Sequence, residues 1–346
     1  MGDAIQKTAI SSLQEVRNLI KELPGPDLES LKKVALHDAQ LTKPMGSLGK
    51  LETLVEWLAS WQAQYPPRLN HPRTSVFAGN HGVAKYGVSA FPSSVTSEMV
   101  KNFVEGGAAV NQLCKTFDAD LRVYELGLEQ PTSDFTTEPA MTEEDCVRAM
   151  AYGMMAIEPG LDVICIGEMG IGNTTSAAAV SMGLFGGKAE EWVGRGTGIT
   201  PETLEKKIKL VQAAVDFHLP QKEDPLSIFA ALGGLELAAI IGTIIAARLA
   251  RVPVILDGFA CTASAAVLFS LDPTTIDHCM VAHRSVEPGH TKLLELMCKD
   301  PLFDLGLRLG EASGATLALG ILKAAVNCHT GMATFSSAGI SGPESR

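Results

Sequence analysis

The segment from Leu161 to Val180, LDVICIGEMGIGNTTSAAAV, constrains the fold of this chain more than any other. It opens with a short apolar run, Leu161–Ile166, which predicts a strand buried on both faces. Three glycines follow, and an alanine-rich stretch then predicts a helix. A strand that turns through glycines into a helix presents unpaired backbone N–H groups to an anion such as phosphate. The spacing matches neither common nucleotide-binding glycine motif, so an ordinary strand–helix connection is the alternative.

Three further segments also predict strands. They are Ser75–Ala78, Leu121–Leu126 and Val252–Leu256, and helical stretches of ten or more residues separate the strand candidates. This alternation predicts an α/β fold with a mainly parallel sheet flanked by helices. Small and polar residues, among them Asn80 and His81, directly follow three of the four strands. We expect them to line one shared crevice at the carboxyl ends of the strands.

The two ends of the chain have a different pattern. Residues 1–70 are mostly helical in pattern with breaks at prolines, and a second helical pattern begins after Asp304. At 346 residues the chain is long for one compact domain. We therefore predict a smaller helical domain from residues 1–70 and 305–346. Residues 71–304 are predicted to form a larger α/β domain that carries the nucleotide site.

Composition argues against several classes of protein. The formal net charge is −11 and the Lys and Arg residues are scattered, so no nucleic-acid partner is expected. The most apolar stretch, Leu226–Ala250, contains Glu236 and predicts a buried helix, so no membrane partner is expected. The seven cysteines form no C-x-x-C pair, and the chain opens without an apolar signal segment. These features predict a cytoplasmic protein with free thiols.

Two further runs are rich in groups that bind phosphate. Gly194–Gly198 is a second glycine-rich loop, and lysines including Lys207 follow it, although a turn before a solvated lysine face explains these residues equally well. The run AHRSVEPGH contains His283 and His290, but it has no firm third ligand, so no metal is predicted. Structural hydrogen bonds, or a Ser285 hydroxyl that reaches a phosphate, explain this turn better.

Two carboxylates stand in unusual surroundings. Glu168 lies in the glycine-rich loop after a strand, where a negative charge beside a phosphate needs another role. Glu311 lies among small and apolar residues, where desolvation raises the pKa of a carboxyl towards that of a general base. A glutamate satisfied by backbone N–H groups at a helix start is the alternative, and composition alone favours it. The residues alone thus indicate an α/β enzyme for a small phosphorylated ligand.

Eight segments, in order from about residue 41 to Phe335, together resemble one enzyme family. They are LTKPMGSLGKLE (41–52), FAGNHGV (77–83), GVSAFPSSVT (87–96), GEMGIGNTT (167–175), GRGTGI (194–199), LDGF (256–259), AHRSVEPGH (282–290) and RLGEASGA (308–315). The chain closely resembles nicotinate-nucleotide–dimethylbenzimidazole phosphoribosyltransferases of cobalamin biosynthesis. The resemblance implies a Rossmann-like sheet, a smaller helical domain from both chain ends, and a homodimer.

The resemblance also implies roles for particular residues. Glu311 is implied as the general base, and Glu168 as a second functional carboxylate. The residues implied for the nucleotide and its phosphate are Gly170, Gly172, Asn173, Thr174, Gly196, Lys207 and Ser285. The residues implied for the aromatic base are Asn80, His81, Phe91, Pro92 and Leu309. Asn80 and Glu125 stand where many relatives have Asp, and the stretch from Gly127 to Pro139 is shorter than usual.

The implied reaction is a direct displacement at C1′ of nicotinate mononucleotide by a nitrogen of dimethylbenzimidazole. Nicotinate leaves as a neutral ring, so neither an acid nor a metal or other cofactor is implied. The product is α-ribazole phosphate. A non-catalytic paralogue that binds the benzimidazole or the nucleotide is the alternative, and loss of the base would be its expected signature. A nicotinamide-dependent dehydrogenase would fit the α/β pattern, but G-x-G-x-x-G is missing after the first strand.

Overall fold

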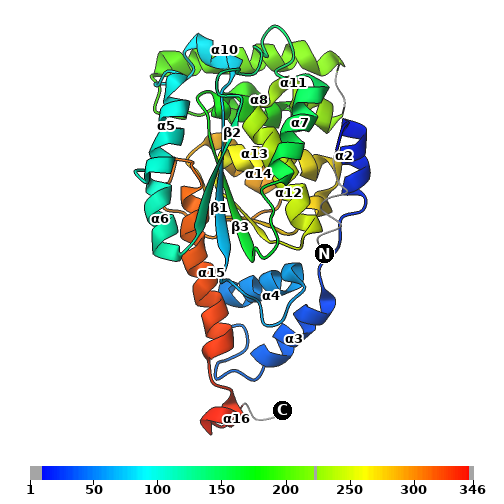
Figure 1. The fold of residues 1–346 in the computed structure, drawn as a ribbon, viewed down its shortest axis with the longest axis vertical. Coiled ribbons are helices and arrows are strands. Elements are labelled where there is room, and N and C mark those ends of the chain that lie inside the picture. The colour runs from blue at the N-terminus through cyan, green and yellow to red at the C-terminus, as the bar shows by residue number, and fades with distance from the viewer. Residues whose placement is uncertain (1–9, 222–223, 343–346) are drawn as a thin grey trace.

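Five parallel strands form the centre of the computed structural model, which describes residues 10–221 and 224–342 (Figure 1). The strands are β1 (Pro72–Gly79), β2 (Asp120–Leu126), β3 (Val163–Met169), β4 (Val254–Leu256) and β5 (Cys279–Val281). Their order in the sheet is β2-β1-β3-β4-β5, and every neighbouring pair is parallel. The winding of the chain reverses between β1 and β3, and in such sheets the carboxyl ends at that point form a crevice. The predicted α/β class is confirmed.

The strand predictions differ from the structure in two places. All four predicted strands are present, but β5 was missed because its three residues give too little pattern. In addition, β3 continues to Met169, so Glu168 is part of the strand and not of the loop that follows. The backbone of Glu168 is therefore held by the sheet.

Helices cover both faces of this sheet (Figure 1). One face carries α7 (Glu143–Met154), α8 (Asn173–Phe185), α12 (Leu235–Leu249) and α13 (Phe259–Leu271). The other carries α4 (Lys50–Gln62), α5 (Ser94–Glu105), α6 (Ala109–Phe117) and α15 (Ser313–Gly331). The remaining α-helices are α2 (Leu13–Ile20), α3 (Leu28–Asp38), α9 (Ala189–Trp192), α10 (Pro201–His218), α11 (Pro225–Leu232), α14 (Pro288–Leu296) and α16 (Phe335–Ala338).

The alternation of side chains along β3 explains why both faces are covered. Ile164 and Ile166 point into the larger hydrophobic cluster, whereas Val163 and Cys165 point into a second cluster with α4 and α15. All four side chains are fully buried. Successive residues of a strand face opposite sides of the sheet, so an apolar run without alternation needs a layer on each side.

The helices from the two ends of the chain meet below the sheet in the view of Figure 1. α15 packs against α4, and Leu41 pairs with Thr334 in an isolated bridge. α2 behaves differently, because Leu13 and Val16 belong to the larger cluster with α7 and α12. The N-terminal helices are thus divided between two clusters, and the two-domain division stays a prediction. Residues 1–9 of the predicted helical region lie outside the described residues.

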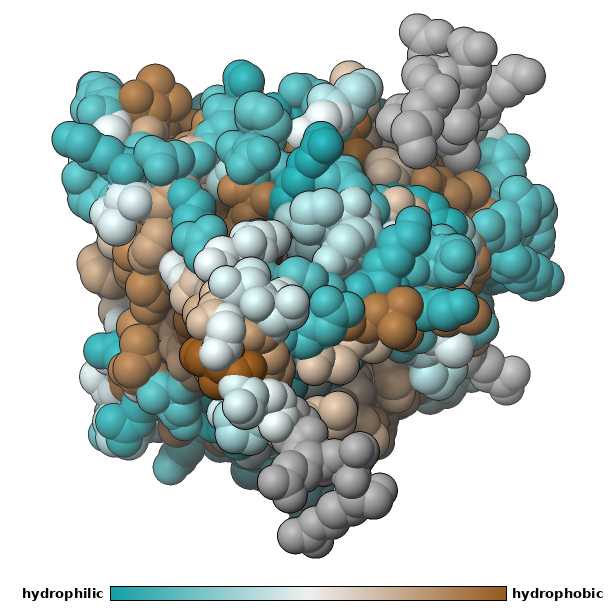
Figure 2. All heavy atoms as spheres, turned by 90° about the horizontal axis from the view of Figure 1, so that it is seen from below, coloured by the Kyte–Doolittle hydropathy of each residue, from teal (hydrophilic) through white to brown (hydrophobic). Residues whose placement is uncertain are grey.

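Large apolar side chains are exposed on several segments near the chain ends. Examples are Leu28, Leu36, Met45, Leu305 and Ile340, each more than half exposed, but Val104 and Met155 in the middle of the chain are more than half exposed as well. Seen from below, the molecule shows apolar patches between hydrophilic side chains (Figure 2). Scattered exposure of this kind is ordinary, whereas contiguous patches mark contact surfaces.

The apolar stretch predicted to be one buried helix forms two. α11 and α12 are separated at Gly233 and Gly234, and a Cβ at Gly234 would lie 2.3 Å from the His81 ring. The break brings Glu236 into the first turn of α12, where its side chain is fully buried. Among the described residues, no helix is long and apolar enough to cross a membrane.

Two glycines allow α7 and α12 to pack backbone against backbone. A Cβ at Gly153 would lie 1.9 Å from the carbonyl oxygen of Ala239, and a Cβ at Gly242 would lie 1.9 Å from that of Met150. Both distances are far below van der Waals contact. Any larger residue at these positions must push the two helices apart.

We expect Gly242→Ala to lower the free energy of unfolding by about 1–3 kcal/mol, because the added methyl group overpacks this contact. Gly331→Ala is the matched control, since Gly331 ends α15 with no atom within 4 Å of an added Cβ. Urea unfolding followed by circular dichroism measures both variants. Equal stability of the two variants would show that the α7–α12 contact tolerates a side chain.

Candidate active site

A cavity of about 240 Å³ lies at the carboxyl ends of the strands, where the sequence predicted a crevice. Residues after β3, β4 and β5 line it, together with the loop 194–198 and residues 308–310. The predicted site residues that line it are Phe91, Glu168, Gly170, Gly172, Asn173, Thr174, Gly196, Ser285 and Leu309. Segments far apart in the sequence therefore converge on one cavity.

A turn of unusual backbone brings the two candidate carboxylates together. Gly310, Glu311 and Ala312 all have positive φ angles, of 82°, 61° and 59°. The backbone N–H of Glu311 donates to the carbonyl oxygen of Glu168 at 3.1 Å. A Cβ at Gly167 would lie 1.9 Å from the backbone nitrogen of Ala312, so only glycine fits there. Glu311 is thus held directly beside the end of β3.

Both carboxyl groups are buried, and their pKa values are raised. Burial raises the pKa of Glu311 to about 7. Burial, with the nearby charges of Asp257, Glu236 and Glu311, raises the pKa of Glu168 to about 8. Asn173 Nδ2 donates a hydrogen bond to Glu168 Oε2, which opposes that rise in pKa. A helix-start glutamate satisfied by backbone N–H groups would have a lowered pKa, so the pKa of Glu311 fits the desolvated alternative.

Two further carboxylates, which were not predicted as site residues, are also buried. Asp257 follows β4, is fully buried, and accepts a hydrogen bond from the backbone N–H of Ala315 at 2.9 Å. Burial raises the pKa of Asp257 to about 7. Glu236 lies 2.6 Å from His81 Nε2 through its Oε1 atom. A polar residue directly after a strand and a single charge in an apolar helix were the available signals.

The residues expected to bind phosphate gather on one side of the cavity. Lys207 is only 1% exposed, and its Nζ donates to Thr174 Oγ1 at 2.8 Å and to the carbonyl oxygen of Gly194 at 3.2 Å. Burial lowers the pKa of Lys207 to about 8. A Cβ at Gly196 would lie 3.0 Å from Thr174 Oγ1. The two glycine-rich loops and one lysine therefore meet at the start of α8.

Only some of the residues expected to bind the aromatic base line the cavity. Phe91 and Leu309 line the cavity and are 52% and 55% exposed. Pro92 is exposed beside Phe91 but is not among the residues that line the cavity.

Asn80 and His81 are engaged by the protein itself. Asn80 accepts from Thr96 Oγ1 at 2.7 Å and donates to the carbonyl oxygen of Leu128 at 2.9 Å. The His81 side chain is fully buried against Glu236. Both residues border a neighbouring hollow of about 610 Å³.

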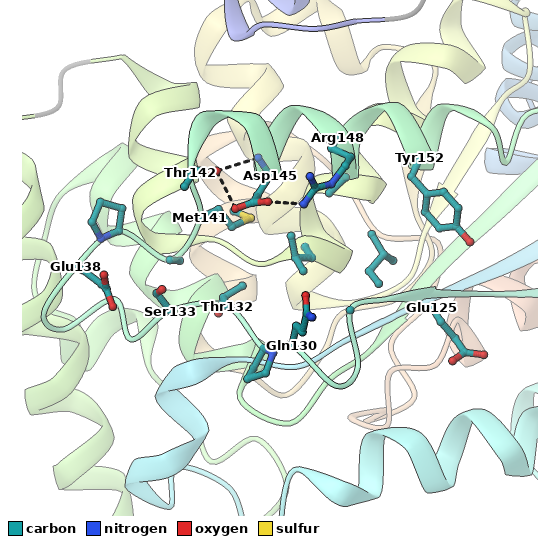
Figure 3. A pocket seen from close by; sticks show the side chains of 17 residues that line it. Glu125, Gln130, Thr132, Ser133, Glu138, Met141, Thr142, Asp145, Arg148 and Tyr152 are labelled. Atoms are coloured by element: carbon teal, nitrogen blue, oxygen red, sulfur yellow. Dashed lines mark hydrogen bonds and ion pairs between the residues drawn. The ribbon is translucent and has the colours of Figure 1, made fainter.

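Another cavity of about 610 Å³ lies beside the edge strand β2, between residues 125–142 and α7 (Figure 3). Two of its charged side chains pair with each other, since Arg148 donates to Asp145, and Thr142 Oγ1 donates to the same carboxylate. It includes residues from 127–139, the segment that the family resemblance suggested to be shorter than usual. None of its lining residues has a buried polar side-chain atom without a partner. The smaller cavity is therefore the better candidate for chemistry.

His290 of the run AHRSVEPGH takes part in structural hydrogen bonds, whereas His283 lines the cavity and its buried Nδ1 has no hydrogen-bond partner within the described residues. His290 Nδ1 accepts the backbone N–H of Ser285 at 2.9 Å, and its Nε2 lies 3.0 Å from Thr262 Oγ1. Both ring nitrogens of His290 are thus occupied by protein groups. Within residues 10–221 and 224–342, no group of three or more His, Cys, Asp or Glu is placed to hold a metal ion.

The raised pKa of Glu168 predicts a pH-dependent stability that Glu168→Gln removes. Between the unfolded pKa of about 4.5 and the folded pKa of about 8, the folded protein binds one more proton than the unfolded chain. Stability is therefore lost as the pH rises through this window, by at most about 1.4 kcal/mol for each pH unit. Glutamine does not ionise in this pH range, so Glu168→Gln removes this contribution to the pH dependence of stability.

Urea unfolding at pH 5 and pH 8 measures this effect. We expect Glu168→Gln to gain stability relative to the unmodified protein as the pH rises, whereas Glu98→Gln, at an exposed position on α5, should not. The same pH dependence in all three proteins would show that Glu168 ionises normally.

Comparison with known proteins extends over nearly the whole chain. The sequence model of a family described as phosphoribosyltransferase matches residues 23–340. A Brucella anthropi protein named nicotinate-nucleotide–dimethylbenzimidazole phosphoribosyltransferase is 55% identical over 328 residues, which are 95% of this chain and 97% of that protein. A Rhizobium meliloti protein of the same name is 53% identical over 330 residues, 95% of this chain and 97% of that one. The crystal structure of an enzyme of this kind from Thermus thermophilus matches with a TM-score of 0.85 and 38% identity, over 92% of this chain and 100% of the other. As the eight sequence segments predicted, the chain belongs to the nicotinate-nucleotide–dimethylbenzimidazole phosphoribosyltransferase family.

Proposed function

We propose that this protein transfers the phosphoribosyl group of nicotinate mononucleotide to dimethylbenzimidazole, with release of nicotinate and formation of α-ribazole phosphate. One observation carries the proposal: two glycine-rich loops, backed by Lys207 through its bond to Thr174, line the same cavity as Glu168. Glu311 is not among the lining residues, but its backbone N–H bonds to Glu168, and both carboxyl groups have pKa values near neutrality. The loops suit the phosphate of a nucleotide, and the carboxyl groups suit proton transfer. The names of the relatives agree with this reaction.

The nucleotide phosphate is proposed to lie between residues 170–174 and Gly196, with Ser285 beside it. An ammonium group has three N–H donors, and two of those of Lys207 are used by Thr174 and Gly194. Within residues 10–221 and 224–342 the ammonium has no third hydrogen-bond partner, so one donor remains for a phosphate oxygen. Because a phosphate is negatively charged, its arrival would also raise the pKa of Lys207 and favour the charged form.

Glu311 is proposed as the general base. A nitrogen of the benzimidazole ring attacks C1′ and forms the new C–N bond, while the bond from C1′ to the pyridinium nitrogen breaks and its electron pair stays on nicotinate. Glu311 takes the proton from the other ring nitrogen. Burial raises the pKa of Glu311 to about 7, so a substantial fraction of this carboxyl is ionised at neutral pH and can accept a proton.

Glu168 is proposed to act as the second carboxyl of the site in its protonated form. A neutral carboxyl can donate one hydrogen bond and accept others, so it can orient the substrate without adding a negative charge near the phosphate. Asn173, at the start of α8, donates to its Oε2 atom and fixes its direction. Removal of Glu168 should therefore disturb orientation more than proton transfer.

The same proposal bears on the alternative function, on the need for a metal and on the oligomeric state. Both carboxylates are present in the site, which argues against a non-catalytic paralogue that binds the benzimidazole or the nucleotide. The leaving group departs as a neutral ring, so the chemistry requires no metal. We also propose a homodimer, which the resemblance to the family implies.

Product analysis tests the reaction. The protein is incubated with nicotinate mononucleotide and, one at a time, dimethylbenzimidazole, other benzimidazoles, purines and phenols. We expect α-ribazole phosphate and an equal amount of nicotinate with dimethylbenzimidazole, both identified by mass spectrometry and chromatography. Binding of both substrates without product would favour the non-catalytic paralogue instead.

The substitution Glu311→Gln tests the base. Glutamine keeps the size of the side chain and removes its basicity, so the turnover number should fall by roughly 10²–10⁴ if proton removal accompanies attack. Affinity for dimethylbenzimidazole, measured by calorimetry, should weaken only slightly because apolar contacts persist. Glu98→Gln on the surface of α5 is the control and should retain full activity. A Glu311→Gln protein with normal turnover would refute the assignment and make Glu168 the better candidate.

A further inference from the structure

The loop from Gly194 to Ile199 is anchored on the phosphate side of the proposed site. Its first carbonyl, that of Gly194, accepts a hydrogen bond from Lys207 at 3.2 Å. The backbone N–H of Gly196 donates to Glu287 Oε1 at 2.8 Å. Both Gly196 and Glu287 line the cavity. A phosphate held by Lys207 in this cavity would therefore contact the loop and limit its movement.

The same loop is bonded on its other side to the segment that carries Phe91. Thr197 Oγ1 accepts the backbone N–H of Ala90 at 3.0 Å, and it lies 3.0 Å from Ser89 Oγ. Among the described residues, every hydrogen bond from residues 89–91 to a distant part of the chain ends at Thr197. Phe91 follows directly and presents a half-exposed ring to the cavity.

The segment 89–94 has little else to hold it in place. Ala90, Phe91 and Pro92 are all exposed, and α5 begins only at Ser94. A segment with few buried contacts and exposed hydrogen bonds opens easily. Two arrangements are therefore available: docked on Thr197 with Phe91 at the cavity, or released from it.

We propose that Thr197 is a positioning residue that makes the phosphate and the aromatic base bind cooperatively. Phosphate binding holds the loop 194–199 in place, the Thr197 hydroxyl then holds residues 89–91, and Phe91 is ready to contact the base. This inference rests on the proposed function for the identity of the two ligands. A ligand shifts such an equilibrium only through its preference for one arrangement, and here the base prefers the docked one because it contacts Phe91.

The coupling must be reciprocal, because the two ligands share one equilibrium. If phosphate raises the affinity of the protein for the aromatic base by some factor, the base raises the affinity for phosphate by the same factor. Couplings of this kind are typically about 5–150-fold. The unliganded protein binds the base with an affinity that is reduced by the fraction of molecules in the released arrangement.

The test measures the dissociation constant of dimethylbenzimidazole by calorimetry, with and without saturating inorganic phosphate, on the full chain. For the unmodified protein we expect phosphate to lower this constant by about fivefold or more. In Thr197→Val the shape is kept and the acceptor is lost, so the ratio should fall to about one. Thr330→Val is the matched control, because its hydroxyl bonds only within α15, and it should keep the full ratio. Ser89→Ala should lose only part of the effect, since Ala90 still donates to Thr197.

Three outcomes would overturn the coupling: an unmodified protein in which phosphate leaves the affinity for the base unchanged, an unchanged ratio in Thr197→Val, or no binding of the base at all. Thermal unfolding of each variant verifies that the fold is intact. The ratio of the dissociation constants of dimethylbenzimidazole without and with phosphate reports on binding and not on turnover. Failure to form α-ribazole phosphate alongside an intact ratio would reject the proposed function and leave the coupling standing, and product formation without coupling would do the reverse.

Discussion

The site depends on the contact between the turn Gly310–Ala312 and the end of β3. A peptide hydrogen bond joins Glu311 to Glu168, and Gly167 leaves the space into which Ala312 fits. Two consecutive residues other than glycine in the left-handed region cost about 1–2 kcal/mol each. The packing of α15 against α4, α6 and the sheet offsets this strain and keeps the turn in place. Without this contact, nothing would hold the turn that carries Glu311 beside Glu168.

The location of the site on the sheet explains its unusual electrostatics. Glu168 lies near the end of β3 and Asp257 directly follows the neighbouring strand β4, so their side chains share one dry region at the carboxyl ends of the strands. Each carboxyl is desolvated, and each adds repulsion to its neighbours, so their pKa values rise together. Burial is the larger cause of each raised pKa, and the repulsion between neighbouring carboxyls adds to it. The sheet topology contributes this second part because it places the groups side by side.

The sequence predicted the layers well and the contacts less well. Long apolar runs such as that of β3 identify buried strands, whereas β5 is too short to carry a pattern. Desolvation of Glu311 could be read from its small neighbours, but the alternative of an ordinary helix-start residue could be rejected only from the three-dimensional turn. The pairing of His81 with Glu236 joins positions 155 residues apart and has no local signature. Family resemblance placed His81 near the base, and the structure shows its ring facing into the protein.

The buried ammonium of Lys207 has a consequence for the proposed binding of the nucleotide phosphate beside it. With a pKa of about 8, a substantial part of the unliganded protein holds this lysine as a neutral amine in mildly alkaline solution. A phosphate favours the charged form, so its association draws protons from the solvent. In the proposed site, the affinity for the nucleotide therefore depends on pH, and it weakens as the pH rises. The positive charge that attracts the substrate is completed only when the substrate arrives.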